Sequence, residues 1–302
     1  MNKLVVLKYK KIIVFLIFSL LFLAKPAFAA SSNTAIFTVG STKYTNSNFL
    51  NLTSSLEITT QNVPSFTYPE SAKITNRDYQ WQYNNITYKW HLEIPNDLLD
   101  WDREVYDLID KFYHSNGHTQ HNILSSVPNS LKEIILSTTL ISNSNHTPFI
   151  NEQNNSLYVK RLADSLSEQA NFNNYDYFHT AEFAQSFVGG AIPYMKSDLP
   201  KLPVQTLVDN GDCTDKSILL ATILKNMGYN VALLFFPNED NQDGHLAVGI
   251  EFSDPQIPTN RDLIYYLHDG VKYYFTETTE PGWKIGEDSD EALDEGFVYP
   301  VN

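Results

Sequence analysis

Residues 211 to 228 read GDCTDKSILLATILKNMG and predict a helix that carries a cysteine in its first turn. Asp212 is suited to the N-cap position, and Asp215 follows it at the spacing of a capping box. Gly228 stands where a C′ residue would end the helix. Because residues 218 to 224 are apolar on most faces of this helix, we expect the helix to be buried against a β-sheet.

Cys213 is the only cysteine of the 302-residue chain. At a helix start, free backbone amides and the positive end of the helix dipole favour thiolate over thiol, and the same amides can bind an oxyanion. A lone thiol in an exported protein is open to oxidation unless it has a task. Cys213 is therefore a candidate nucleophile, and the alternative from the residues alone is a buried, inert side chain.

Four strands are predicted after the cysteine helix, over residues 231–236, 245–252, 262–268 and 271–276. Asp269-Gly270 joins the last two as a tight hairpin turn. His245 begins its strand and Glu277 follows the end of another, and each of the two intervals from Cys213 to His245 to Glu277 is 32 residues. Strand ends can direct two side chains into one site without disturbing the core.

The chain before the cysteine helix alternates strand and helix signals. Residues 31 to 68 suggest a weakly structured or β-rich leader, and Asn84-Asn85 separates two alternating runs that predict a β-hairpin. Helical spacing predicts three helices, over residues 96–113, 157–170 and 176–188. We expect Gly189-Gly190 to break the last helix, and three later prolines to extend the chain toward the cysteine.

His114, His118 and His121 are candidate ligands of a metal ion, because the first two have the spacing of neighbours on a helix face. Ser115-Asn116-Gly117 lies between them and is a poor helix former, and no carboxylate completes a ligand pattern. The interpretation favoured here is a solvated loop. We expect neither a metal nor a cofactor.

Residues 1 to 29 have the pattern of a cleaved signal peptide. Lysines precede an apolar run over residues 12 to 24, and Ala27-Phe28-Ala29 fits the cleavage site. The run is too short to span a bilayer, which needs roughly 20 residues. Without the five lysines of this segment, 16 basic residues stand against 35 acidic ones. This acidic balance argues against nucleic acid and anionic lipid as partners.

Three blocks of the sequence together resemble the transglutaminase-like superfamily, in its branch of prokaryotic proteins described as cysteine proteases. They are GDCTDKS at 211–217, GHLAVG at 244–249 and YYFTETTEPGWKIG at 273–286. The resemblance spans residues 157 to 287, with fainter likeness over residues 81 to 94. Each block alone is weak, but the three in this order are specific.

The resemblance implies an α+β fold with a papain-like core, in which the helix bearing the cysteine packs on an antiparallel sheet and an N-terminal hairpin and helix region precedes it. It also implies a catalytic triad, which maps onto Cys213, His245 and Glu277. Two departures stand out. The third member of the triad is Glu where the wider superfamily usually has Asp, and Glu280 is a rival for that role. His245 is followed by Leu246-Ala247, where Ala-Trp is common in the superfamily.

The sequence thus predicts a signal peptide at 1–29, a β-rich and helical region at 30–155 and a transglutaminase-like catalytic core at 156–302. The expected activity is that of an exported cysteine-dependent enzyme of acyl transfer, a peptidase, amidase or cross-linking transglutaminase, acting on a peptide or protein. After cleavage we expect no stable membrane insertion. A non-catalytic binding or scaffold module with the same fold is the alternative, and a metal site on Cys213 and His245 lacks further ligands.

Overall fold

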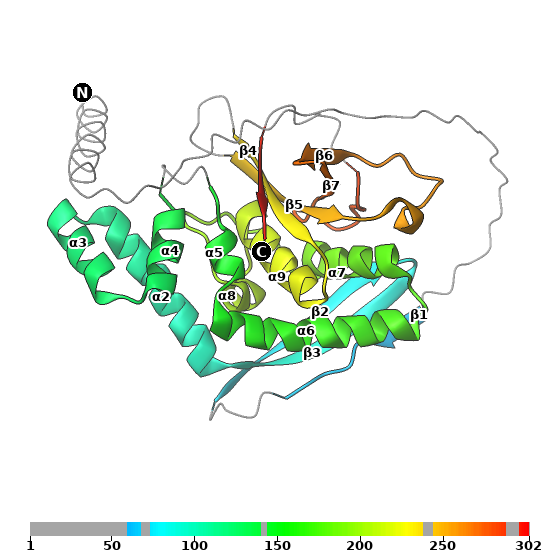
Figure 1. Ribbon diagram of the computed structural model, residues 1–302. Coiled ribbons are helices and arrows are strands. Elements are labelled where there is room, and N and C mark those ends of the chain that lie inside the picture. Colours follow the sequence, from blue (N-terminus) through cyan, green and yellow to red (C-terminus); the bar gives the residue numbers. More distant parts are fainter. Residues whose placement is uncertain (1–58, 68–72, 140–143, 238–243, 288–295, 302) are drawn as a thin grey trace, which may run out of the picture.

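The computed structural model describes residues 59–67, 73–139, 144–237, 244–287 and 296–301 (Figure 1). Within them the fold is α+β, with eight α-helices, a three-stranded mixed sheet and a five-stranded antiparallel sheet that curls into a half-barrel. The predicted signal peptide and most of the predicted leader lie outside the described residues.

The three-stranded sheet is built around the predicted hairpin. β2 (Ile74–Tyr83) and β3 (Ile86–Pro95) pair antiparallel, and Asn84 and Asn85 adopt left-handed φ values of 48° and 62°, as a type I′ turn requires. β1 (Thr59–Asn62) adds to β3 in parallel. The side chains that point inward from the hairpin are large and mostly aromatic, so this face of the sheet buries a substantial apolar area in the core.

A lateral group of helices follows the hairpin, from α2 (Asn96–His114) through α3 (Gly117–Ser126) and α4 (Asn129–Ser137) to α5 (Thr147–Ile150). Helix α2 confirms the prediction, but the solvated loop expected after it is wrong. Asn116 caps α3 by accepting a hydrogen bond from the Thr119 amide at 3.0 Å, so the helix breaks and restarts between His114 and His118.

Two long helices, α6 (Gln153–Phe172) and α7 (Tyr177–Ala191), confirm two further predictions in kind. The break expected at Gly189-Gly190 is wrong, because α7 runs through both glycines. A β-carbon on Gly189 would lie 3.0 Å from the Glu280 carbonyl oxygen, and one on Gly190 would lie 3.2 Å from Cβ of Trp81. These glycines serve close packing of the helix rather than its termination.

α8 (Pro203–Asp209) and α9 (Cys213–Asn226) lead into the five-stranded sheet, and α9 confirms the predicted cysteine helix. The sheet has the order β6-β7-β5-β4-β8. Its strands are β4 (Val231–Pro237), β5 (Gly244–Glu251), β6 (Tyr265–His268), β7 (Val271–Thr276) and β8 (Phe297–Pro300). Four of them were predicted, and the edge strand β8 was not.

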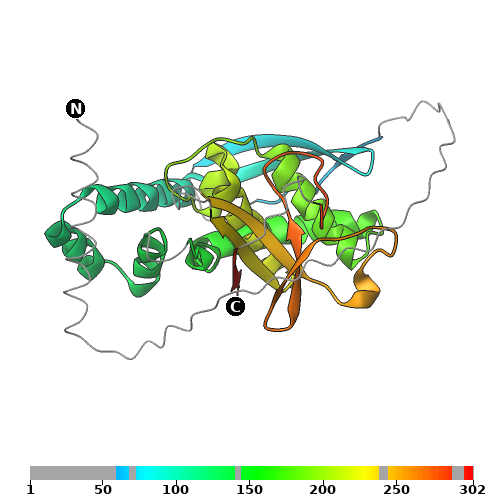
Figure 2. The ribbon, with the colours of Figure 1, turned by 90° about the horizontal axis from the view of Figure 1, so that it is seen from above.

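Helices α7 and α9 lie between the two sheets (Figure 1), where α7 packs on β2 and α9 packs on β4 and β5. Seen from above, α2 to α5 extend to one side of these layers (Figure 2). One hydrophobic cluster runs from Val63 to Ile285 through the hairpin, the helices and the sheet. The predicted boundary at residues 155 and 156 falls inside α6.

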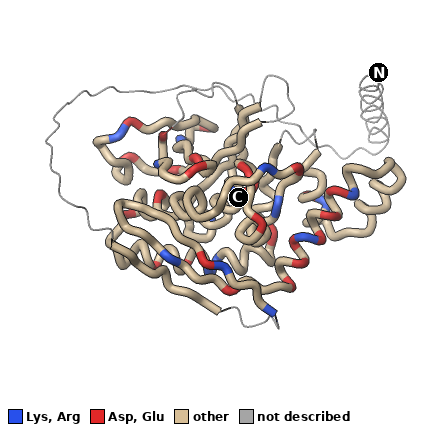
Figure 3. The backbone as a smooth tube through the Cα atoms, turned by 180° about the vertical axis from the view of Figure 1, so that it is seen from behind, with Lys and Arg blue, Asp and Glu red and all other residues tan. Residues whose placement is uncertain are grey.

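Acidic residues occur on both the helices and the strands of the described fold (Figure 3). Among the described residues, no helix combines the length and the apolar character needed to cross a bilayer.

Candidate active site

Cys213 is the first residue of α9 and is partly exposed. Asp212 caps the helix by accepting hydrogen bonds from the amides of Thr214 at 2.9 Å and Asp215 at 3.3 Å, and Asp215 accepts from the Asp212 amide at 3.2 Å. The predicted capping box is therefore present. The amide of Cys213 itself donates to no described residue, so it is available to an oxyanion.

The start of α9 is fixed in place by a buried ion pair. The backbone amide and the Nζ atom of Lys201 donate to the two carboxylate oxygens of Asp215, at 2.7 and 3.0 Å. Burial raises the pKa of Asp215 to about 6, and the neighbouring Asp212 adds to the rise. Gly211 is required beside this pair because a β-carbon there would overlap the Asp215 side chain.

His245 is the second residue of β5, the strand that packs against α9. Its Nε2 atom lies 2.8 Å from the Glu277 Oε2 atom, which leaves Nδ1 as the ring nitrogen available to Cys213. One residue further along, the Leu246 carbonyl oxygen accepts a hydrogen bond from the Ser217 hydroxyl at 2.8 Å. This bond ties the nucleophile helix to the strand that carries the base.

Glu277 follows the last residue of β7 and is 8% exposed. Its Oε1 atom accepts from the amides of Thr278 at 2.7 Å and Thr279 at 2.9 Å. Burial raises the pKa of Glu277, but the hydrogen bond and charge of His245 and the two amides outweigh it, so that the pKa lies below its ordinary value. The carboxylate therefore stays ionised and has one oxygen directed to the imidazole.

The imidazole of His245 is stabilised in its protonated form. Burial lowers its pKa, but hydrogen bonds and charges of Cys213 and Glu277 outweigh burial and raise the pKa to about 10. A proton on the ring at neutral pH is the partner that a thiolate needs. An imidazolium beside Cys213 can therefore act as a counterion and as a proton donor at this site.

Lys216 also lies at this site, and nothing in its sequence context indicates a role there. Its side chain is fully buried, and its Nζ atom donates to the carbonyl oxygens of Ile192 at 2.8 Å, Thr279 at 3.2 Å and Gly189 at 3.4 Å. Burial lowers the pKa of Lys216 to about 8, against the charges of Glu277 and Glu280. The ammonium joins the end of α7 to the loop that begins at Glu277.

The structure thus brings together all three residues of the predicted triad. Glu280, the rival third member, is exposed and forms no hydrogen bond with His245. His114 and His118 lie on different helices, and the described residues contain no group of three potential metal-ligating side chains.

No family model, curated protein or solved structure matches this chain.

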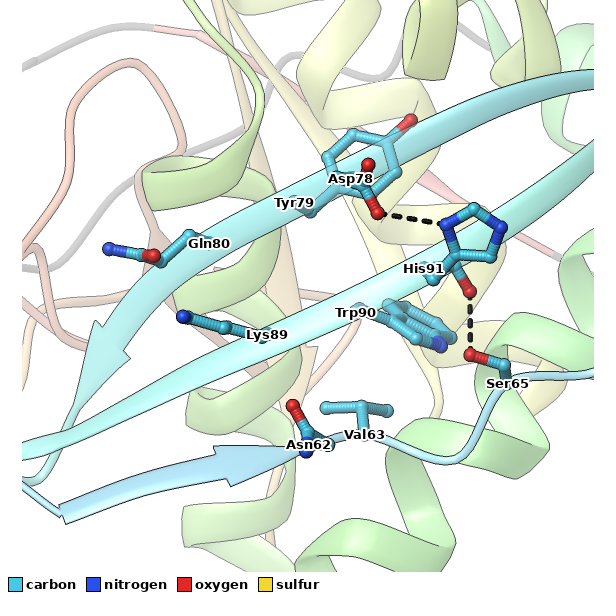
Figure 4. Close-up of a pocket in the computed structure, with 9 residues that line it drawn as sticks. All are labelled: Asn62, Val63, Ser65, Asp78, Tyr79, Gln80, Lys89, Trp90 and His91. Carbon is cyan, nitrogen blue, oxygen red and sulfur yellow. Dashed lines mark hydrogen bonds and ion pairs between the residues drawn. The ribbon is translucent and has the colours of Figure 1, made fainter.

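A separate polar hollow lies on the three-stranded sheet and shares no residue with the triad (Figure 4). Asp78 and His91 pair across it at 2.8 Å, and Ser65 donates to the His91 carbonyl oxygen at 2.7 Å. Both side chains of the pair are exposed, at 86% for Asp78 and 49% for His91, so water screens their interaction.

Proposed function

We propose that this protein is a cysteine-dependent enzyme of acyl transfer. The observation that carries the proposal is the pairing of His245 with Glu277 at 2.8 Å beside a cysteine in the first turn of a capped helix. A nucleophile, a base and a residue that orients the base are the three parts of such a site. The papain-like, transglutaminase-like core suggested by the sequence is part of the same proposal.

In the first half of the reaction the Cys213 thiolate attacks the carbonyl carbon of an amide, forming a carbon–sulfur bond and an oxyanion. The unpaired Cys213 amide is one donor for that oxyanion. As the carbon–nitrogen bond breaks, His245 gives its Nδ1 proton to the leaving amine, and a thioester remains. Water or a second amine then attacks the thioester, His245 takes the proton of the attacking group, and the thiolate is released.

The proposed substrate is a peptide or a protein, and the enzyme acts outside the cytoplasm after the signal peptide is removed. The cleavage site over residues 27 to 29 supports export. Mass spectrometry of the mature protein should find an N-terminus at or near Ala30. A full-length chain that stays in the membrane fraction would contradict export and leave the chemistry unaffected.

The rival proposal is a binding module that keeps the fold without turnover. p-Nitrophenyl acetate separates the two, because it acylates any competent thiolate. An enzyme gives a burst of p-nitrophenol with acetyl on Cys213, followed by steady release, and Cys213→Ala gives neither. Equal rates in wild type and Cys213→Ala would favour the binding module.

A further inference from the structure

The segment between α7 and α8 runs beside the residues that lead into the nucleophile. Tyr194 forms a parallel β-bridge with Gly211, in which the Met195 amide donates to the Gly211 carbonyl oxygen at 2.9 Å and the Gly211 amide donates to the Pro193 carbonyl oxygen at 3.5 Å. Gly211 is two residues before Cys213. This segment is therefore the chain that borders the start of α9.

The bridge leaves one hydrogen-bonding edge open. In a parallel bridge the flanking residues, here Pro193 and Met195, bond to the partner chain, so the amide and carbonyl of the central residue point to the opposite side. Tyr194 accordingly makes no backbone hydrogen bond to any described residue. One donor and one acceptor therefore face away from Gly211, as the edge of a sheet presents them.

Both ends of the segment are anchored to the active site. The Ile192 carbonyl oxygen accepts from Nζ of Lys216 at 2.8 Å, and the Ser197 amide donates to the capping carboxylate of Asp212 at 3.3 Å. The phenol of Tyr194 interacts electrostatically with the site: burial raises its pKa, and the charges of Cys213 and Asp212 raise it further. The open edge is thus held at a fixed place relative to the thiol.

Two large side chains on this edge are exposed, Tyr194 at 53% and Met195 at 50%. Large apolar side chains with half their surface in water suit contact with another molecule. An extended peptide offers a backbone donor and acceptor at the spacing of this edge, and its side chains can contact those of Tyr194 and Met195. A ligand without a peptide backbone would leave the two backbone groups unpaired.

We propose that Tyr194 binds an extended peptide substrate by strand addition, with Tyr194 and Met195 contacting its side chains. This inference rests on the proposed acyl transfer, because it places a peptide carbonyl beside Cys213. The substrate class is then an unfolded or extended segment of a protein rather than a folded surface or a small amide.

The test uses acetyl-trialanine vinyl sulfone, in which the Cys213 thiolate adds to the β-carbon and the α-carbon takes a proton. Each peptide nitrogen of the probe is methylated in turn. Methylation of the nitrogen that pairs with Tyr194 should slow labelling about tenfold, near the upper value of one hydrogen bond. Methylation of the adjacent nitrogen, whose N–H points to the other side of the strand, should leave the rate within about twofold.

Two variants locate the effect. Tyr194→Pro removes the backbone donor and should lower the labelling rate of the unmethylated probe, whereas Tyr194→Ala keeps the donor and should retain the preference between the two methylated probes. The rate of alkylation by iodoacetamide, which has no peptide backbone, is measured in each variant, and the labelling rate of the peptide probe is divided by it.

If methylation at each nitrogen slows the labelling of wild type equally, the strand-addition proposal is overturned. A fast reaction with iodoacetamide in the same protein would leave the proposed function standing. A dimer that dissociates in Tyr194→Ala would assign the edge to a second copy and also overturn it. Iodoacetamide rates equal to those of free cysteine would overturn the proposed function first and this inference with it.

Discussion

Glu277 receives three hydrogen bonds in a buried position, from His245 and from the amides of Thr278 and Thr279. Glu277→Gln keeps the shape but replaces a carboxylate by a neutral amide, which stabilises imidazolium less and can favour the wrong tautomer. We expect the alkylation rate of Cys213 at neutral pH to fall roughly tenfold, the equivalent of about 1.4 kcal/mol. Iodoacetamide labelling followed by mass spectrometry measures this rate.

Glu280→Gln is the matched control, since Glu280 is three residues further on and exposed. Its alkylation rate should stay within about twofold of wild type, because charges in water interact weakly. A loss in Glu280→Gln with none in Glu277→Gln would reassign the third member.

Lys216 is a positioning residue, because its ammonium bonds to three backbone carbonyls and not to the reacting atoms. Lys216→Met fills similar space and leaves those carbonyls without their donor, so the loop after Glu277 should lose its fixed position. We expect slower alkylation of Cys213. Lys160→Met, which removes an exposed lysine paired with Asp164, should leave the rate unchanged.

The pH dependence of stability gives Lys216 a second readout. Burial lowers the pKa of Lys216 in the folded chain from its ordinary value of 10.5 to about 8, so between these values the unfolded chain binds more protons at this residue. The contribution of Lys216 to the free energy of unfolding therefore rises with pH across this window. Compared with Lys216→Met, wild type should gain stability from pH 8 to pH 10 in urea unfolding. A difference that stays constant over this range would show that burial does not lower the pKa of Lys216.

At the scale of elements, β5 begins at Gly244 immediately before His245. A β-carbon on Gly244 would overlap the Phe235 ring and lie 2.7 Å from the Phe236 carbonyl oxygen. Gly244→Ala should therefore push the start of β5 away from β4, at a cost of about 1–3 kcal/mol, and slow alkylation by moving His245. Chemical denaturation and labelling measure the two effects.

Gly117→Ala is the control for Gly244→Ala, because a β-carbon on Gly117 has no atom within 4 Å. It should leave stability within about 0.5 kcal/mol and labelling unchanged. Equal effects of the two substitutions would show that the close packing at Gly244 is not what positions His245.

Features that depend on local sequence were predictable. The capping box of α9 and the Asn84-Asn85 turn each involve residues within a few positions of one another, so their geometry is visible in the sequence. The continuation of α7 through Gly189-Gly190 was not, because it depends on close contacts with Trp81 and Glu280, which are distant in sequence. β8 was missed for the same reason, since a four-residue edge strand takes its identity from its pairing with β4.

Among the residues of the candidate site, some could be predicted from the sequence and others could not. The order and strand-end positions of His245 and Glu277 indicated that they could meet, and the three sequence blocks supported this prediction. Lys216 and Tyr194 had no such signal. A lysine in an apolar helix is ordinarily exposed, and the open edge of Tyr194 exists only because the chain returns to Gly211.

At the scale of the whole molecule, the hairpin and the helices beneath the candidate site share one core. The rings of Trp81 and Trp90 each lie 5.1 Å from that of Phe187 in α7. α7 in turn binds the loop of the triad, because Gln185 donates to the Glu277 carbonyl oxygen at 2.9 Å. The N-terminal hairpin therefore supports the loop that begins at Glu277.

This arrangement predicts that the fold and the site are lost together. Unfolding in urea followed by tryptophan fluorescence should have the same midpoint as the loss of the enhanced reactivity of Cys213. If Cys213 loses its reactivity at a urea concentration well below the fluorescence midpoint, the loop that begins at Glu277 opens separately from the hairpin.

We propose that His245 and Glu277 together make Cys213, the only cysteine of the chain, a nucleophile. The most direct measurement is the second-order rate of alkylation of Cys213 by iodoacetamide at neutral pH, in wild type and in His245→Ala. We expect a wild-type rate well above that of free cysteine and a His245→Ala rate that falls toward it, because the imidazolium partner of the thiolate is gone. A wild-type rate like that of free cysteine, unchanged in His245→Ala, would contradict it.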